Sequence, residues 1–291
     1  MKTGADISHH QRTFDAKRYK DSGEDFIILK ATEGTQFTSR TFASRWRDAG
    51  ARNLPRGAYH FARPGGAVNP QADHFIEVVQ AAGFRAGDAW ALDLERVEGR
   101  GAAQLVDWAD KWIARVRAAL GGIGLFYAST GFITGQLGSP DHVPGGALTW
   151  VARYNSTVRT PWQGLRRPAA FPDPPAVWQR TDGKLGRAKR VASIGLCDFN
   201  EMTDTAFAAL FKGSAAGFAA FVEPDDITTE ELLDALRSKE GQEILRAAVS
   251  PAVRHELRVA TGPNDGSVPA STYFDSLRKD VSDIKASIVQ P

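Results

Sequence analysis

The sequence has almost no cysteine and no long hydrophobic run, and both absences narrow the class of protein. Cys197 is the only cysteine in 291 residues, which excludes an intramolecular disulfide and a zinc cluster built on cysteines. No apolar run approaches the ~20 residues that a membrane-spanning helix needs. Residues 1–6 lack the apolar core of a signal peptide. We therefore expect a protein made in the cytoplasm without stable membrane insertion.

Signatures of nucleotide and nucleic-acid binding are also missing. No glycine-rich phosphate loop follows the first strand candidate, residues 4–8. Residues 1–213 carry 28 Lys and Arg against 21 Asp and Glu, a net of +7 that favours approach to polyanions. The chain nevertheless contains neither a Lys/Arg-rich helix nor zinc-finger spacing. We therefore expect no nucleic-acid partner and no nucleotide cofactor.

The composition changes near residue 213, which predicts a domain boundary there. Residues 214–291 carry 8 Lys and Arg against 13 Asp and Glu, a net of −5, whereas all seven tryptophans precede the boundary. The pattern predicts a small helical region, 214–291, after a larger domain, 1–213. Its last predicted helix, 272–289, carries an a/d heptad seam. The seam residues are Phe274, Leu277, Val281, Ile284 and Ile288.

Strand and helix patterns alternate through the first domain. The strand candidates are residues 4–8, 26–31, 57–62, 89–95, 124–129, 148–154, 176–180 and 195–199. Helices are predicted at 15–21, 41–49, 69–82 (Asn69 as N-cap and Pro70 as first helical residue), 102–119 and 203–211. Alternation of this kind argues for a parallel sheet. Eight strands predict a closed, degenerate α/β barrel of the TIM type with fewer helices in its second half; an open doubly wound sheet is the alternative.

Two acids in the strand candidate 89–95 suggest chemistry. Side chains alternate along a strand, so Asp93 and Glu95 share one face while Leu92 and Leu94 share the other. Same-face neighbours lie roughly 6–7 Å apart, and two ionised carboxylates at that distance repel, which raises one pKa. Glycoside hydrolysis uses paired acids whose pKa values are split in this way.

Further acids and aromatics fall near the ends of other strand candidates. Asp6 lies in the first candidate and Asp198 in the last. The C-terminal ends of the strands form the active-site face of an α/β barrel, so we expect these acids to meet Asp93 and Glu95 there. Aromatic residues also mark these strands, either as core or as a sugar-binding rim: Tyr59, Tyr127, Trp150 and Trp178.

Seven short motifs occur in one order along residues 1–212. They are Asp6-x-Ser8-x-x-Gln11, Lys30-Ala31-Thr32-Glu33-Gly34, Gly57-Ala58-Tyr59-His60-Phe61, Asp93-x-Glu95, Tyr127-Ala128-Ser129, Trp178-Gln179 and Asp198-x-Asn200. In this order the sequence resembles family 25 of the glycoside hydrolases, the lysozymes of the Chalaropsis type, which are common as phage endolysins. The resemblance implies hydrolysis of the β-1,4 bond between N-acetylmuramic acid and N-acetylglucosamine in bacterial peptidoglycan, without a metal or other cofactor.

The resemblance also implies roles for individual residues. Glu95 matches the general acid of the family, with a pKa raised by the neighbouring charge of Asp93. Asp93 matches the second carboxylate, which either attacks directly or orients the substrate's own N-acetyl group. Asp6 and Asp198 match two flanking acids. The substrate-binding candidates are Tyr59, Tyr127, Trp178, Lys30, Gln179 and Trp150.

Two positions depart from the pattern of the family. Arg180 stands where an aromatic residue is usual, which puts one glycan contact in doubt. Cys197 stands where a small aliphatic residue is common, and we interpret it as a packing residue.

Two other classes of protein compete for the first domain. A metal-dependent hydrolase could use histidines, although none has the spacing of a helical zinc motif: His9, His10, His60 and His74. A non-catalytic sugar-binding barrel would require the acid pair to be vestigial. We expect no metal site.

For residues 214–291, three hypotheses remain: binding to the cell wall, homo-oligomerisation through the heptad helix, or an accessory role. The missing signal peptide and the resemblance together predict a phage enzyme made in the host cytoplasm and released to the wall with the help of a holin.

Overall fold

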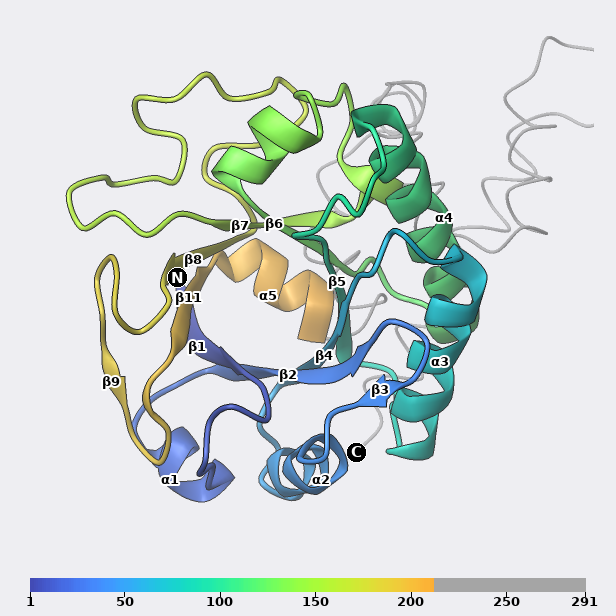
Figure 1. Ribbon diagram of the computed structural model, residues 1–291. Coiled ribbons are helices and arrows are strands. Elements are labelled where there is room, and N and C mark those ends of the chain that lie inside the picture. Colours follow the sequence, from blue (N-terminus) through green and yellow to red (C-terminus); the bar gives the residue numbers. More distant parts are fainter. Residues whose placement is uncertain (212–291) are drawn as a thin grey trace, which may run out of the picture. The chain divides into compact units, whose positions relative to one another are not determined.

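A computed structural model of the chain describes residues 1–211 and shows a closed barrel (Figure 1). Eight strands follow one another in the order β1–β11–β8–β7–β6–β5–β4–β2, and β2 pairs with β1 to complete the ring. The strands are β1 (Lys2–Ile7), β2 (Phe26–Glu33), β4 (Arg56–Phe61), β5 (Ala89–Asp93), β6 (Leu125–Ser129), β7 (Leu148–Ala152), β8 (Val177–Thr181) and β11 (Asp198–Met202). The predicted α/β barrel is confirmed, and closure excludes the open sheet.

Helices surround the first half of the barrel, as predicted, while loops dominate the second half (Figure 1). The helices of the first half are α1 (Ala16–Asp21), α2 (Phe42–Ala51), α3 (Val68–Ala81) and α4 (Ala102–Leu120). The minor elements are β3 (Phe37–Thr38), η1 (Phe132–Gln136), η2 (Pro144–Gly146), β9 (Arg190–Val191) and β10 (Gly195–Leu196). No helix within residues 1–211 is long and apolar enough to cross a membrane.

The predicted C-terminal features fall on other residues. Three predictions concern residues outside the described part of the chain: the boundary at residue 213, the helical region 214–291 and the heptad helix 272–289. The predicted homo-oligomer depends on the heptad helix and therefore also concerns those residues.

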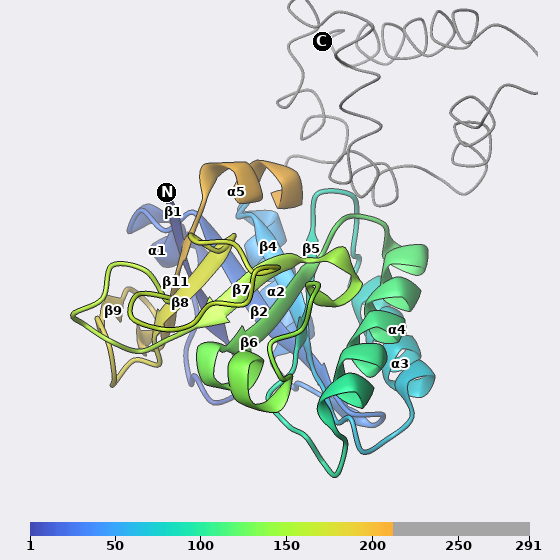
Figure 2. The same ribbon diagram turned by 90° about the horizontal axis from the view of Figure 1, so that it is seen from above.

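Two apolar cores flank the barrel wall because side chains alternate along each strand. On β5, Trp90 and Leu92 face outward into the core beneath the helices, whereas Ala89 and Ala91 face the barrel interior. Helix α5 (Asp204–Phe211) supplies further residues to the interior core and lies with the N-terminus at one end of the barrel (Figure 2). The opposite end is therefore the one available for a site.

The last strand runs against the predicted direction. The sequence predicted a parallel strand at residues 195–199, but β11 begins at Asp198 and is antiparallel to both β1 and β8. A parallel neighbour needs a long crossover, usually a helix, and residues 182–197 contain only the β9–β10 hairpin. The reversal puts the first residue of β11 where β1 ends, so Asp198 pairs with Asp6 in register.

Two element boundaries also differ from prediction. The N-cap of α3 is Ala67, so Asn69 and Pro70 lie within the first turn, where proline is tolerated because its missing N–H has no helical partner. Strand β5 ends at Asp93, although Leu94 N still donates to Tyr127 O at 3.0 Å. Glu95 therefore lies beyond the end of the strand.

Tyr19 of α1 ties the first two strands together from outside the barrel. Its hydroxyl accepts a hydrogen bond from Ala5 N at 2.6 Å and donates to Phe26 O at 2.7 Å. The strands come so close beside this bridge that a Cβ on Gly4 would lie 2.3 Å from Phe26 O. Tyr19 is fully buried, so no water can replace its hydroxyl.

We expect Tyr19→Phe to lower the free energy of unfolding by about 2–4 kcal/mol, because it leaves a buried N–H and a buried carbonyl without partners. Urea unfolding of the full chain measures the change. Lys17→Ala is the control on the same helix: it removes an exposed ion pair with Asp21, and we expect a change within about 0.5 kcal/mol. Equal losses in the two variants would contradict the bridging role.

Candidate active site

Four carboxyl groups meet at the open end of the barrel, from three strands that are far apart in sequence. Asp6 is the last residue but one of β1, Asp93 ends β5, Asp198 begins β11, and Glu95 follows β5 by two residues. Burial, followed by the charges of these four acids, raises the pKa of Tyr59 well above its usual value. All four therefore lie near enough to Tyr59 for their charges to act on its hydroxyl group.

Asp6 is the most firmly held of the four. Its Oδ2 accepts a hydrogen bond from Gln179 Nε2 at 2.8 Å and another from Asn200 Nδ2 at 2.8 Å. Burial raises the pKa of Asp6 to about 6, with a smaller contribution from the charge of Glu95, while the two amide hydrogen bonds oppose the shift. The side chain is thus fixed in position and poised to titrate near neutral pH.

Three aromatic side chains fix the two amides that hold Asp6. Tyr127 and Tyr154 donate their hydroxyl hydrogens to Gln179 Oε1 at 2.8 and 2.5 Å. Trp150 Nε1 donates to Asn200 Oδ1 at 2.8 Å. Because each amide oxygen accepts these bonds, each amide nitrogen is turned toward the carboxylate.

Sequence reasoning found only part of this support. The sequence predicted three of these residues as substrate-binding: Gln179, Tyr127 and Trp150. Asn200 was noted only as part of the motif Asp198-x-Asn200, without a role, and Tyr154 was not predicted. The position of Tyr154, two residues beyond β7, was the available signal.

Asp93 is buried without the partners that Asp6 has. Its side chain is 7% exposed, and within residues 1–211 its Oδ1 has no hydrogen-bond partner. Burial and then the charge of Glu95 raise the pKa of Asp93 well above its usual value, against the opposing charge of Lys30. The raised pKa that the sequence suggests for Glu95 stays a prediction; in the structure, Asp93, the buried member of the pair, is the acid whose pKa is raised.

Glu95 is exposed at the mouth. Within residues 1–211, no group donates a hydrogen bond to the carboxyl of Glu95. It is therefore the member of the acid pair that an incoming ligand reaches first.

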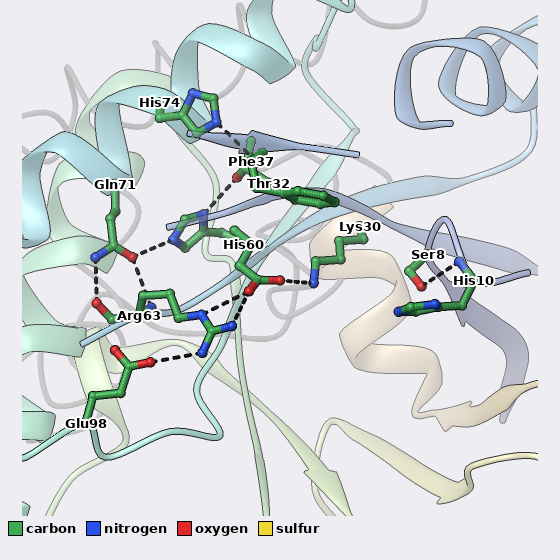
Figure 3. A network of polar contacts seen from close by, with 11 residues as sticks. Ser8, His10, Lys30, Thr32, Phe37, His60, Arg63, Gln71, His74 and Glu98 are labelled. Carbon is green, nitrogen blue, oxygen red and sulfur yellow. Dashed lines mark hydrogen bonds and ion pairs between the residues drawn. The ribbon is translucent and has the colours of Figure 1, made fainter. Parts of the chain in front are cut away.

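Lys30 brings positive charge to the mouth through a network of ion pairs (Figure 3). Its Nζ lies 2.6 Å from Glu33 Oε2, and Glu33 Oε1 accepts a hydrogen bond from Arg63 Nε at 2.9 Å. Arg63 Nη1 in turn lies 3.0 Å from Glu98 Oε1. Lys30 was predicted as a site residue; Arg63 and Glu98 were not, because their ion pairs join segments about 30 residues apart and leave no signal in sequence spacing.

The predicted aromatics divide between the two faces of the barrel wall. Tyr59 and Tyr127 face the interior near the acids, and Trp150 packs beneath them with ring centroids 6.5 and 4.7 Å away. Trp150 is only 2% exposed, so it supports the two tyrosines and presents almost no surface to a ligand.

Trp178 lies on the opposite face of β8. Val177 and Gln179 point into the barrel, so alternation turns Trp178 and Arg180 outward. Trp178 is buried there, and Arg180 Nε lies 3.2 Å from Glu201 Oε1. The side chains of Trp178 and Arg180 therefore lie on the face of β8 away from Gln179, and the role of Trp178 as a glycan contact stays a prediction. Cys197 is buried.

Of the four histidines considered for a metal site, His9 and His10 lie side by side, with ring centroids 4.1 Å apart. His60 is buried, with its ring nitrogens 2.8 Å from Thr32 Oγ1 and 3.2 Å from Gln71 Oε1. In the part of the chain that the structure describes, no cluster of three or more His, Cys, Asp or Glu is arranged to hold a metal ion.

Comparison with known proteins places this geometry in a family. The family described as glycosyl hydrolases family 25 matches residues 5–184. An N,O-diacetylmuramidase of Chalaropsis sp. is 30% identical over 194 residues, covering 62% of this chain and 87% of the relative. An N,O-diacetylmuramidase of Arthroderma benhamiae is 28% identical over 173 residues, covering 54% and 70%.

Solved structures agree. A lysozyme from Streptomyces coelicolor superposes with a TM-score of 0.63 at 25% identity, covering 72% of this chain and 97% of that one. The family match at residues 5–184 includes Asp6, Asp93 and Glu95. The chain therefore belongs to family 25 of the glycosyl hydrolases, and it is a glycosidase of the lysozyme type that hydrolyses peptidoglycan.

Proposed function

We propose that the chain cuts the β-1,4 bond between N-acetylmuramic acid and N-acetylglucosamine, with Glu95 as general acid and Asp93 as its partner. The observation that carries the proposal is the acid pair itself. One carboxyl is buried and one is exposed, and the charge of the exposed Glu95 acts on the buried Asp93. A glycosidase needs two carboxyls in two different environments.

A general acid must hold a proton and reach the leaving oxygen. Burial of Asp93, and then repulsion from Glu95, raise the pKa of Asp93 well above its usual value, so the pair retains a proton above the pH at which an isolated aspartate would ionise. Glu95 is the exposed member, so a glycosidic oxygen meets its carboxyl. Loss of the proton to the leaving group then leaves a negative charge beside the developing positive charge on the sugar.

In this proposal Asp93 stabilises the positive charge that develops on the sugar. It does so by attacking the anomeric carbon or by holding the substrate's N-acetyl group while that group attacks, and both routes need its carboxylate form. The charge of Lys30 favours that form. The unpartnered Oδ1 is the atom free to make the contact.

The two flanking acids orient the sugar. Asp6 is held by Gln179 and Asn200, so its remaining lone pairs face the mouth in a fixed direction. Asp198 pairs with Asp6 in register, and its pKa of about 8 keeps it protonated near neutral pH, so its carboxyl can donate a hydrogen bond to the sugar.

For the biological setting we propose lysis of a bacterial host by a phage product that reaches the wall with a holin. The support is the motif resemblance described above. Expression in a susceptible host with and without a co-expressed holin tests it: lysis only with the holin supports the role, and lysis without it contradicts the release route.

Glu95→Gln should lower the rate of peptidoglycan hydrolysis by about 10²–10⁴-fold, because general acid catalysis contributes that much. The assay is digestion of purified peptidoglycan with analysis of new reducing ends. We expect N-acetylmuramic acid ends from the unchanged chain. N-acetylglucosamine ends, or freed peptide amines, would contradict the proposed bond.

Glu77→Gln is the matched control, since Glu77 is an exposed glutamate on α3. We expect its rate to equal that of the unchanged chain. Survival of activity in Glu95→Gln would contradict the role of Glu95, while loss in both variants would point to a folding defect that circular dichroism detects.

The raised pKa values also predict how stability depends on pH. Burial and the charge of Asp6 raise the pKa of Asp198 to about 8, whereas an unfolded aspartate titrates near ~3.9. Between these values the native state binds more protons than the unfolded chain, so the free energy of unfolding falls as the pH rises from about 4 to about 8.

Asp198→Asn should flatten this fall, most clearly above about pH 6, where Asp6 has largely titrated. Urea unfolding at about pH 5, 6.5 and 8 gives the slope. Asp107→Asn is the control, because Asp107 is an exposed partner of Lys111 and its removal should leave the slope unchanged. An unchanged slope in Asp198→Asn would contradict the assignment.

A further inference from the structure

We propose that Phe37, His9 and His10 form an additional sugar-binding surface, the aromatic shelf, beside the acid cluster. Its occupant is an N-acetylhexosamine ring of the same glycan strand, beyond the two sugars that flank the cleaved bond. The inference rests on the proposed function in one respect: it requires that the substrate be a glycan chain long enough to reach the shelf.

The shelf lies at the end of the barrel that carries the acids. Ser8 alone separates His9 and His10 from Ile7, the last residue of β1. Phe37 lies on β3 and pairs with Glu33 at the end of β2. Adjacent parallel strands end at one edge, so both segments project from the mouth.

Lys30 makes the shelf continuous with the active site. Its Nζ lies 5.6 Å from the centroid of the Phe37 ring, and its charge acts on both His9 and Asp93. A ligand that contacts the acid pair therefore has the shelf as the next surface on the β1–β2 side.

The rings of the shelf pack against one another and still face solvent. The ring centroids of His9 and His10 are 4.1 Å apart, and those of His9 and Phe37 are 5.2 Å apart. Phe37 remains 40% exposed. Among the large apolar side chains that are exposed within residues 1–211, it alone is aromatic; the others are Met1, Leu165, Leu185 and Leu196.

Buried polar contacts hold the histidine loop in position. Arg45 of α2 is buried, and its guanidinium donates to Ser8 O at 2.6 Å and to Gln11 O at 2.5 Å. Ser8 N donates to Gln11 Oε1 at 2.8 Å, and His10 N donates to Ser8 Oγ at 3.3 Å. A loop fixed in this way binds without first losing conformational freedom.

Phe37 is fixed as well. Its carbonyl oxygen lies 3.3 Å from His74 Nε2 of α3, and Ser39 N donates to Ala31 O at 2.8 Å to close the short hairpin. Hydrogen bonds therefore hold the backbone that carries the exposed ring of Phe37. A ring held in this way is suited to binding, because its position is set before the ligand arrives.

The charge state of the shelf suits a neutral sugar. Burial, and then the charges of His10, Lys30 and Arg40, lowers the pKa of His9, against the opposing charge of Glu33. His9 is thus neutral at neutral pH. The C–H face of a pyranose ring is apolar and packs well on flat rings, while its hydroxyls keep their contacts with water.

The test measures binding of peptide-free glycan strands on the Glu95→Gln background, where no cleavage intervenes. Phe37→Ala and Phe37→Leu should each weaken binding about five- to tenfold, since a lost aromatic contact is worth roughly 1 kcal/mol and tenfold is 1.4 kcal/mol. Phe37→Tyr keeps the flat ring and should restore most of the affinity. Leu165→Ala removes an apolar side chain that is 43% exposed on another loop and is the matched control.

With Glu95 intact, Phe37→Ala should raise KM for long strands several-fold with little change in kcat. Equal binding by Phe37→Ala and Phe37→Tyr overturns the shelf, as does a loss seen only with strands that carry stem peptides, which would assign the surface to peptide. Failure of the unchanged chain to produce N-acetylmuramic acid ends overturns the proposed function instead, so the two failures are distinguishable.

Discussion

Two hydrogen bonds onto Asp6 join the beginning of the barrel to its end. Gln179 and Asn200 lie 173 and 194 residues away from Asp6 in sequence, and both donate an amide hydrogen to the same carboxylate oxygen. A buried carboxylate is costly unless it is hydrogen bonded, so the site forms only when the last strands close on the first. Closure of the barrel and construction of the active site are therefore one event.

This arrangement divides the barrel interior into two halves with different tasks. Near α5 the interior is apolar, and side chains such as Phe26 and Met202 pack there without polar atoms. At the mouth it contains carboxyls whose pKa values burial raises, which means that their charged forms destabilise the native state. The apolar half supplies the stability that the acidic half costs, a division expected where activity needs unfavourable groups.

Sequence reasoning predicted the barrel and the acid cluster because both depend on local pattern. Alternation of strands with helices indicates parallel pairing, and an acid at the end of a buried strand is visible without any knowledge of its neighbours. The predicted direction of β11 was wrong, because the sequence of a single short strand does not show whether it runs parallel or antiparallel to its neighbours. Asp198 was nevertheless placed at the correct edge, because reversal exchanges the end of the strand for its start.

Which face a side chain occupies, and which partner it finds, depended on tertiary contacts. Trp178 was taken for a site residue by motif, but Gln179 has to point inward to reach Asp6, and alternation then turns Trp178 outward. Tyr154 reaches the site through one long-range hydrogen bond to Gln179. Burial raises the pKa of Asp93, and the D-x-E spacing alone does not show which of the two acids is buried.

Lys30 shows how a single charge connects these levels. Its ammonium group offsets the repulsion among the carboxyls at Asp93, pairs with Glu33, and lies against the rings of Phe37 and Phe61. Because its side chain is buried, it cannot swing into solvent, and its position is set by Glu33, which Arg63 and Glu98 hold from the rim. A glycan that displaces water from this region lowers the local dielectric, which strengthens the pull of Lys30 on Asp93 together with the burial and the repulsion from Glu95 that oppose it. Lys30 is therefore the charge that favours the carboxylate of Asp93, the form that both proposed routes require.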